Sequence, residues 1–336
     1  MNRIASANRT PWWIATVIMV ILAVASLADL ANTPFGGFFA SGGTRISQVA
    51  EGGPAQAAGL EVGDEILVTD GIDTSDLHAL FRQPRATVGE ARQLVVEREG
   101  EAAPLELAVT YTELPTVQKA LTLGAALIGF AFLCAGIGAF FRAPSHRSRL
   151  LAWLGIVAMA VFVTPPYLAH AELRLFYSLV PLVATMLLPA LIVHFLLNTP
   201  RRRRFLDRGI ALWLLYGPAA VAGLLGFATF FVRPQLLQTT IFVATAVPVA
   251  LLLIAIVLLG VTYWRASPSQ RATQGLGVLL LGFTIGLLPV ILSGLVPSLP
   301  GGQFYFLTLI LVPLALAYTE LKNTPEPLTE LQPEAF

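Results

Sequence analysis

The sequence predicts a mostly α-helical membrane protein with about eight transmembrane helices and one small α+β domain inserted after the first helix. Three observations predict this fold class. Of the 336 residues, 56% are hydrophobic and only 12% are charged, which is more apolar surface than one soluble core of ordinary proportions covers. Apolar runs near the roughly 20 residues that span a bilayer recur along the chain. One stretch, residues 34–114, interrupts them with charges and Gly-rich turns.

The first element, within residues 1–33, is a short leader containing Arg3 and Arg9, followed by an apolar run over residues 11–28. That run is longer than the roughly 7 to 15 residues of a signal-peptide core. We therefore expect an uncleaved first transmembrane helix with the leader in the cytoplasm. Small residues at positions 23, 25 and 28 keep a cleaved signal peptide open as the alternative.

Seven further apolar runs after the insert predict a helical bundle over residues 115–320. Short connections favour antiparallel neighbours, and recurrent Gly and Ala favour close packing between membrane helices. Residues 321–336 are rich in Pro and Glu and are expected to form a short disordered cytoplasmic tail. The seven runs cover approximately residues 117–141, 150–169, 175–197, 209–232, 240–263, 275–296 and 304–318.

Basic residues predict the orientation, because cytoplasmic loops of membrane proteins carry an excess of Lys and Arg. Arg-rich connections alternate along the chain with connections that hold single basic residues. This pattern places both termini of a multi-pass protein in the cytoplasm and the insert outside. In a bacterium, the membrane would be the cytoplasmic (inner) membrane. The strongest basic segment has two open roles, an anchor at anionic membrane lipid or a docking patch for a cytoplasmic partner. It consists of Arg201, Arg202, Arg203 and Arg204.

The insert, residues 34–114, alternates short strand-like runs with turn residues. Strands are expected at residues 45–49, 65–69, 93–98 and 105–110, and helices at residues 55–59 and 74–81. Asp70-Gly71 and Glu99-Gly100 fit turns between strands. Thirteen acidic residues against five arginines give the insert a formal net charge of −8. A neutral or basic peptide is therefore favoured as its partner over a polyanion, and no nucleic acid is expected.

The stretch from Ile46 to Gly71, ISQVAEGGPAQAAGLEVGDEILVTDG, resembles the core signature of bacterial PDZ domains. Pro54-Ala55, Ala58-Gly59-Leu60 and Gly63-Asp64 stand in the order that such domains have. Gly59 fits the left-handed position that ends a helix, and Gly63-Asp64 fits a tight turn. The resemblance implies a fold that adds an extended peptide, often a free C-terminus, to a sheet edge beside a helix.

The same resemblance implies a loop whose backbone N–H groups hold the carboxylate of the peptide. Its counterpart here is Phe35-Gly36-Gly37-Phe38, with Phe39 next. His78 lies on the expected groove helix, where some PDZ domains place a ligand-contacting histidine. Two alternatives stay open: the phenylalanines also fit aromatic residues at a membrane interface, and His78 also fits a solvated helix position.

Motifs for catalysis and metal binding are absent from the sequence. The histidines include no i, i+4 pair for zinc, and neither a Gly-x-Ser-x-Gly elbow nor a Gly-x-x-x-x-Gly-Lys phosphate loop occurs. The single cysteine, Cys134, provides no disulfide and no cysteine cluster for a metal. We therefore expect no enzyme activity, no catalytic residue, no metal site and no cofactor. Ionisable residues inside the apolar runs are nearly confined to His194, which disfavours a transporter.

The membrane half carries a second resemblance. The segment from His194-Phe195 to Thr199-Pro200, followed by arginines, resembles a feature of multi-helix sensor regions in bacterial signalling proteins. Those sensors, the competence-type quorum-sensing histidine kinases, also carry a PDZ-like domain after the first helix. No kinase domain follows Tyr318 in this sequence. The stretches that resemble their last two helices are Gln270-Arg271 with Gly282 and Leu288-Pro289, and Val312-Pro313 through Ala317-Tyr318.

Together these resemblances imply a membrane sensor or receptor module. An extracytoplasmic peptide or protein C-terminus would bind the groove, and the helices would relay this event to a separate cytoplasmic signalling protein. Two alternatives stay open. One is a membrane-anchored PDZ scaffold or chaperone-like factor without signalling, and the other is a transporter of an apolar solute.

Overall fold

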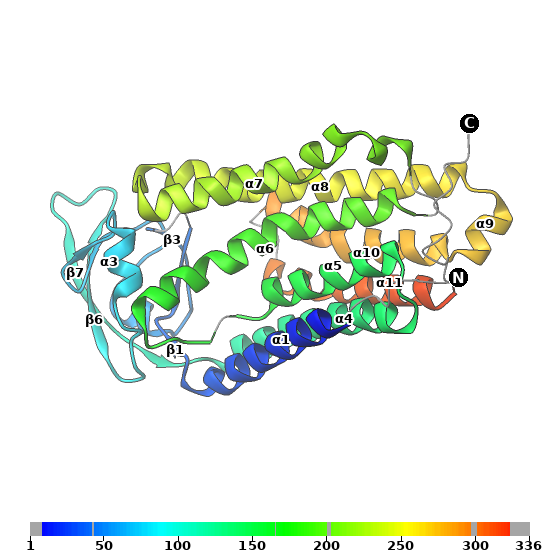
Figure 1. Ribbon diagram of the computed structural model, residues 1–336. Coiled ribbons are helices and arrows are strands. Elements are labelled where there is room, and N and C mark those ends of the chain that lie inside the picture. Colours follow the sequence, from blue (N-terminus) through cyan, green and yellow to red (C-terminus); the bar gives the residue numbers. More distant parts are fainter. Residues whose placement is uncertain (1–8, 42–43, 165, 200–202, 297–300, 323–336) are drawn as a thin grey trace.

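The computed structural model describes residues 9–41, 44–164, 166–199, 203–296 and 301–322. These residues form a bundle of long helices and a small β-sheet domain packed against one end of it (Figure 1). The domain lies in the chain between helix α1 (Thr10–Asp29), which continues as a 3₁₀ turn η1 (Leu30–Asn32), and helix α4 (Thr116–Arg142). The predicted class, a mostly helical chain with one inserted α+β domain, is confirmed.

Seven helices among the described residues are long and apolar enough to cross a membrane. The eighth expected span is α5 (His146–Phe162), a helix of 17 residues at the lower limit for crossing. It ends before the predicted boundary because Val163 is already extended and prolines follow at positions 165 and 166. Beyond α1 and α4, the long helices are α6 (Ala171–Leu197), α7 (Gly209–Phe231), α8 (Leu237–Arg265), α10 (Leu276–Leu295) and η4 (Gly302–Ile310) continued by α11 (Leu311–Lys322).

Helices α4 and α5 approach each other through glycines, as the sequence predicts for close packing in a membrane. A Cβ atom added to Gly155 of α5 would lie 2.6 Å from the carbonyl oxygen of Phe132 and 3.0 Å from the Cα atom of Leu133. Both are backbone atoms of α4, so a side chain at position 155 would push the two helices apart. Leu151 and Leu154 of α5 are fully buried beside this contact.

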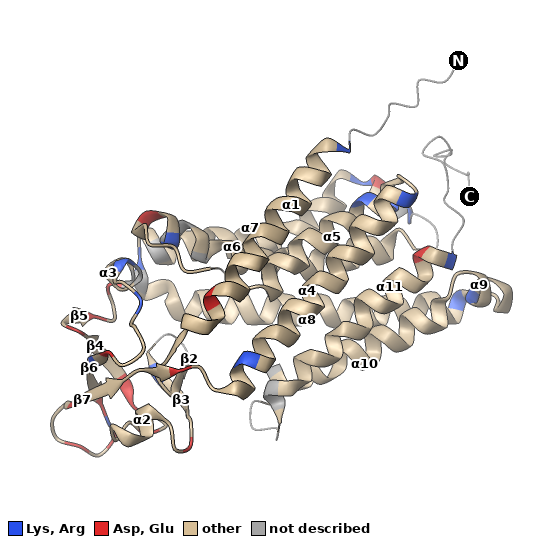
Figure 2. Ribbon diagram, turned by 90° about the horizontal axis from the view of Figure 1, so that it is seen from below, with Lys and Arg blue, Asp and Glu red and all other residues tan. Residues whose placement is uncertain are grey.

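Successive long helices run in opposite directions (Figure 1). The start of α1 and the end of α11 therefore lie at the end of the bundle away from the β domain. The ring of Trp12, in the first turn of α1, lies 4.9 Å from that of Phe140, in the last turn of α4. Several Lys and Arg residues lie at this far end, whereas Asp and Glu are frequent on the β domain (Figure 2). Three short helices connect the long ones: η2 (Arg204–Asp207), η3 (Pro234–Leu236) and α9 (Pro268–Thr273).

The β domain contains an antiparallel sheet with the strand order β2-β3-β4-β6-β7. Four strands begin and end within two residues of their predicted bounds, but β2 is missed because its sequence, Phe-Phe-Ala-Ser, lacks alternation. The strands are β2 (Phe38–Ser41), β3 (Arg45–Val49), β4 (Glu65–Thr69), β6 (Ala91–Glu97) and β7 (Leu105–Thr110), with β5 (Ile72–Asp73) paired to β4; the helices are α2 (Pro54–Ala57) and α3 (Leu77–Arg82).

Two further strands form a stem between the domain and the bundle. β1 (Pro34–Phe35) pairs antiparallel with β8 (Thr112–Glu113), with Pro34 opposite Glu113 and Phe35 opposite Thr112. β1 follows η1 directly, and β8 is followed by α4. The chain therefore enters and leaves the domain through adjacent strands, next to the ends of α1 and α4.

An ion pair between a partly exposed arginine and a buried aspartate supports the core of the domain. Arg98 donates from Nε to Asp64 Oδ1 and from Nη2 to Asp64 Oδ2, both at 2.8 Å, and from Nη2 to the carbonyl oxygen of Gly59 at 2.7 Å. Asp64 is only 1% exposed. These hydrogen bonds from Arg98 lower the pKa of the Asp64 carboxyl, against the opposing effect of burial. Ile46, Leu60 and Val96 fill the apolar core beside the pair.

Candidate functional site

The loop between β1 and β2 has a backbone shape that requires glycine. Gly37 has a φ of +80°, which disfavours side chains, and a Cβ atom there would lie 2.8 Å from Pro54 Cδ. Its carbonyl oxygen accepts a hydrogen bond from the N–H of Ala50 at 2.8 Å. The loop Phe35-Gly36-Gly37-Phe38 is therefore fixed against α2 and leads directly into β2.

Strand β2 and helix α3 form the two sides of a groove. Within the described residues, β2 pairs with β3 along one edge, and no strand pairs with its other edge. Phe39 is 44% exposed, and its ring lies 6.3 Å from the buried ring of Phe35. On the other side, Asp76 caps α3 by accepting a hydrogen bond from the N–H of Ala79 at 2.9 Å. An edge strand beside a short helix is the arrangement used for β-strand addition.

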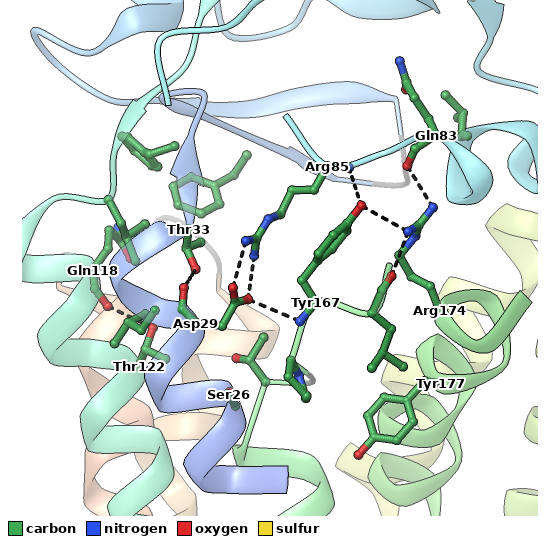
Figure 3. Close-up of a pocket in the computed structure, with 18 residues that line it drawn as sticks. Ser26, Asp29, Thr33, Gln83, Arg85, Gln118, Thr122, Tyr167, Arg174 and Tyr177 are labelled. Atoms are coloured by element: carbon green, nitrogen blue, oxygen red, sulfur yellow. Dashed lines mark hydrogen bonds and ion pairs between the residues drawn. The ribbon is translucent and has the colours of Figure 1, made fainter. Parts of the chain in front are cut away.

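A cavity of about 530 Å³ joins this groove to the ends of the membrane helices. From the β domain, its walls include Phe35 and Phe39 before and within β2, Leu80 of α3, and Gln83 and Arg85 after α3. The bundle supplies the opposite walls and the floor (Figure 3). These bundle residues come from α1, α4, the α5–α6 connection and α6, and include Ser26, Asp29, Gln118, Thr122, Tyr167, Arg174 and Tyr177.

Four polar side chains connect the domain to the bundle along the cavity; we call Asp29, Arg85, Tyr167 and Arg174 the polar clamp (Figure 3). Arg85 donates to both carboxylate oxygens of Asp29, at 2.6 and 2.9 Å. The N–H of Tyr167 donates to Asp29 Oδ2 at 3.2 Å. The Tyr167 hydroxyl accepts from Arg174 Nη1 at 3.2 Å and from the N–H of Arg85 at 3.3 Å. The clamp thus ties the segment after α3 to α1 and α6.

Helix α3 is held against the bundle by further contacts. Arg174 Nη2 donates to the carbonyl oxygen of Arg82 at 2.7 Å and to that of Gln83 at 3.2 Å. Arg82 forms an ion pair with Glu172 in the first turn of α6. The His78 ring lies edge-on to the Phe231 ring of α7, with centroids 6.4 Å apart. The helix side of the groove is therefore fixed relative to the membrane helices.

The charge of the cavity differs from that of the rest of the domain. Two arginines and one aspartate line it, whereas the insert as a whole has a formal net charge of −8. Positive charge is therefore concentrated where the groove meets the bundle. The arrangement suits a segment that places a carboxylate near Arg85 and Arg174 and a neutral or basic body along the domain.

The predicted peptide-contacting residues fall into four groups. Phe35 and Phe39 line the cavity, and Gly36 and Gly37 shape the loop next to it. Phe38 packs on the apolar core of the domain. His78 lies on α3 as predicted, but the described cavity-lining residues of α3 do not include it. The ligand role of His78 stays a prediction.

The polar clamp was not predicted from the sequence. Asp29 ends an apolar run, and Arg174 stands in an outer connection where basic residues are few. Those isolated charges at helix ends were the only local signal. Their partners lie 56 residues away for Asp29 and Arg85, and 92 residues away for Arg174 and Arg82, a separation that the pattern of one sequence does not bridge.

Two residues of the predicted docking patch, Arg203 and Arg204, lie at the end of the bundle away from the β domain. Arg201 and Arg202 lie outside the described residues. Arg203 donates from Nη2 to Thr262 Oγ1 at 2.8 Å, so this arginine is held against α8, and Arg204 begins η2. Nearby, His194 Nδ1 and the Tyr216 hydroxyl are hydrogen-bonded at 2.8 Å. Among the described residues, no group of three His, Cys, Asp or Glu side chains is arranged to hold a metal ion.

Comparison with known proteins identifies one part of the chain. No solved structure matches the chain. A family model described as a PDZ domain matches residues 45–98, which run from β3 through β6 and include α3. The loop at residues 35–38 and strand β2 lie just before this match. Residues 45–98 therefore form a PDZ domain, a peptide-binding module, in a chain whose long apolar helices indicate a multi-pass membrane protein.

Proposed function

We propose that this protein is a membrane receptor that binds an extended extracytoplasmic peptide segment in a groove shared by its PDZ domain and its helix bundle. The observation that carries the proposal is the cavity of about 530 Å³ between β2, α3 and the ends of α1, α4 and α6. A bound segment would touch both parts of the molecule at once. Binding could therefore act on the helices without an intervening domain movement.

The peptide is expected to add to the sheet as a strand along β2. Backbone hydrogen bonds to the unpaired edge would provide affinity, and side-chain pockets would provide specificity. Phe35 and Phe39 supply the apolar wall for a side chain of the peptide. The N–H groups of the Gly36-Gly37 loop and the nearby cations of the polar clamp would receive its terminal carboxylate.

The relay to a cytoplasmic partner follows from the same geometry. A ligand shifts an equilibrium between two helix arrangements by the difference in its affinity for them. The groove occupant would contact α1, α4 and α6, which all continue to the basic end of the bundle (Figure 2). That end, with Arg201 to Arg204, is the surface that we propose for the cytoplasmic partner, and the abundance of arginines there supports a cytoplasmic location.

Peptide binding can be measured with the full chain in nanodiscs. We expect a fluorescent peptide that ends in a free carboxylate to bind, and Phe39→Glu to weaken binding about ten-fold or more, because it replaces an aromatic anchor and repels the carboxylate. Val62→Glu is the matched control. Val62 is 64% exposed in the turn between α2 and β4, so the same charge is added away from the groove.

Equal binding by the Phe39→Glu and Val62→Glu proteins would place the peptide elsewhere. Binding by neither the wild type nor the Val62→Glu protein, across peptides with free and amidated C-termini, would reject the receptor proposal. The scaffold alternative is supported by the many contacts that hold the domain to the bundle. A scaffold would bind the peptide in this assay, but the peptide would not change the distances between the membrane helices.

A further inference from the structure

The floor of the cavity lies within the outer turns of the membrane helices. Ser26 stands one turn before the end of α1, Thr122 in the second turn of α4, and Tyr177 in the second turn of α6. All three helices are long and apolar enough to cross a bilayer. Since such helices end near the membrane surface, the cavity reaches the level at which the bilayer meets water.

The cavity therefore lies between the β domain and the outer turns of the membrane helices, at the height of the membrane surface. Helix α3, on one side, is fastened to α6 and α7 through Arg82 and His78. The loop and β2, on the other side, stand above α1 and α4, and Figure 3 shows the cavity between the strands above and these helices below. A polypeptide that leaves the bilayer beside these helices would have its last residues at the level of the cavity.

The two arginines beside the cavity indicate which end of the peptide lies there. Arg174 is fixed beside the cavity by its bonds to the carbonyl oxygens of Leu168, at 2.8 Å, and Arg82, at 2.7 Å. Arg85 is fixed by Asp29. Both side chains are held beside the cavity before any ligand binds, so their positive charge is already in place when a carboxylate arrives. The acidic remainder of the domain would repel the same carboxylate.

We propose that the ligand of this groove is the C-terminal segment of another membrane-embedded polypeptide, whose last residues emerge from the bilayer beside α1, α4 and α6. This inference rests on the proposed function and names the class of its ligand. Confinement of both partners to one membrane raises their effective concentration. A groove with low affinity for peptides would thereby bind membrane-anchored chains in preference to soluble peptides of the same sequence.

The test compares tethered and free forms of one C-terminal tail. The full chain, with the photo-crosslinking residue p-benzoyl-phenylalanine in place of Phe39, is placed in phosphatidylcholine nanodiscs. The tethered probe is a Leu/Ala transmembrane peptide with an outer tail of about eight residues, which reaches roughly 26 Å when extended. The free probe is the tail alone. We expect at least about ten-fold more crosslinking of the tethered probe at equal amounts, and little when the same crosslinker replaces Val62.

A second comparison tests the carboxylate. Amidation of the tethered tail is expected to lower crosslinking several-fold, since a charged hydrogen bond to arginine is lost. Arg174→Gln should remove this preference for the free carboxylate, and Arg174→Lys, which keeps the positive charge, should retain much of it. Arg45→Gln is the control, because Arg45 is exposed on β3 outside the cavity.

The outcomes separate this inference from the receptor proposal. Equal crosslinking of the tethered and free tails would overturn the membrane-embedded ligand and leave peptide binding intact. Crosslinking at Phe39 to phosphatidylcholine in place of the tethered peptide would also overturn it, with lipid as the occupant. Loss of all binding, including that of soluble peptides in the fluorescence assay, would reject the receptor proposal itself.

Discussion

Tyr167 holds two positive side chains in place at the mouth of the cavity. Its ring lies 4.6 Å from Arg85 Cζ and 5.2 Å from Arg174 Cζ. Cations over an aromatic face gain about 0.5 to 2 kcal/mol, more where water is excluded. The hydroxyl adds a hydrogen bond to each of the same two residues. One side chain therefore keeps two like charges close together, and Asp29 balances one of them.

Asp64 gives a prediction at the scale of a single residue. Because its folded-state pKa is lowered by Arg98, its contribution to stability is present above the unfolded value of about 3.9 and is lost as the pH falls through the lower folded value. We expect Asp64→Asn to destabilise the domain at pH 7 by about 1.5 to 3 kcal/mol, the range for hydrogen bonds to charged groups. Hydrogen exchange of β4 and β6 in the full chain, corrected for intrinsic rates, measures this difference.

The pH dependence distinguishes the ion pair from a packing defect. The stability gap between wild type and Asp64→Asn should narrow as the pH falls below about 4. Glu106→Gln, at an exposed position on β7, is the matched control and should show no comparable gap. A gap of constant size from pH 7 to pH 3 would contradict the assigned role of the Asp64 charge.

Some residues that line the cavity could be predicted from the sequence, and others could not. Phe35 and Phe39 were predicted from the loop motif, because their neighbours Gly36 and Gly37 define that loop locally. Tyr167 was not predicted, since an aromatic residue between two apolar runs has no local signature. Its importance comes from side chains that only the folded chain brings together.

At the scale of elements, α3 has two roles. Leu80 of this helix lines the cavity, and Arg82 and His78 contact α6 and α7. In the proposed receptor, a peptide that displaces α3 would therefore act on two membrane helices. The short length of α3 suits this role, because a helix of this size gains most of its stability from its packing partners.

Patterns in the sequence predict elements well when each has its own periodicity or turn. β3, β4 and β7 were predicted at their observed bounds, and the seven late apolar runs all became helices. The errors occur where adjacent parts of the chain determine whether an element forms or where it ends. β2 forms because β3 pairs with it, and α5 is shorter than its apolar run because prolines follow it. The position of the groove against the bundle could not be predicted, since it depends on contacts between distant elements.

The alternation of helix direction leads to a prediction about loop location. In a background with Cys134→Ser, single cysteines replace Glu99 in the β6–β7 turn or Arg208 before α7, both exposed. A membrane-impermeant maleimide should label Glu99→Cys in intact cells and Arg208→Cys only after permeabilisation. The reason is that basic loops stay in the cytoplasm. Labelling of both or neither position in intact cells would contradict the orientation.

At the scale of the whole molecule, the receptor and scaffold alternatives differ in what happens at the basic end. Spin labels at Arg142 of α4 and Trp264 of α8, both exposed near the helix ends away from the β domain, report the distance between those helices. For a receptor we expect the bound peptide to shift the distance distribution measured by double electron–electron resonance. A ligand that favours one of two arrangements must change their populations.

The same labels in the Phe39→Glu protein provide the control, because peptide binding is expected to be weak there. An unchanged distribution in the wild type at saturating peptide would favour the scaffold. A shift that also occurs in the Phe39→Glu protein at equal peptide would assign the movement to a different site.

The stem of β1 and β8 has a consequence for how such a molecule can be built. Paired residues in an antiparallel ladder stand about 4.5 to 5.5 Å apart, so Pro34 and Glu113, which face each other, are separated by little more than one peptide unit. The eighty residues from Pro34 to Glu113 form a unit whose deletion would leave the chain ends after α1 and before α4 close enough for a short linker. A helix bundle of this kind can gain or exchange its recognition module without rerouting any part of the chain inside the bilayer.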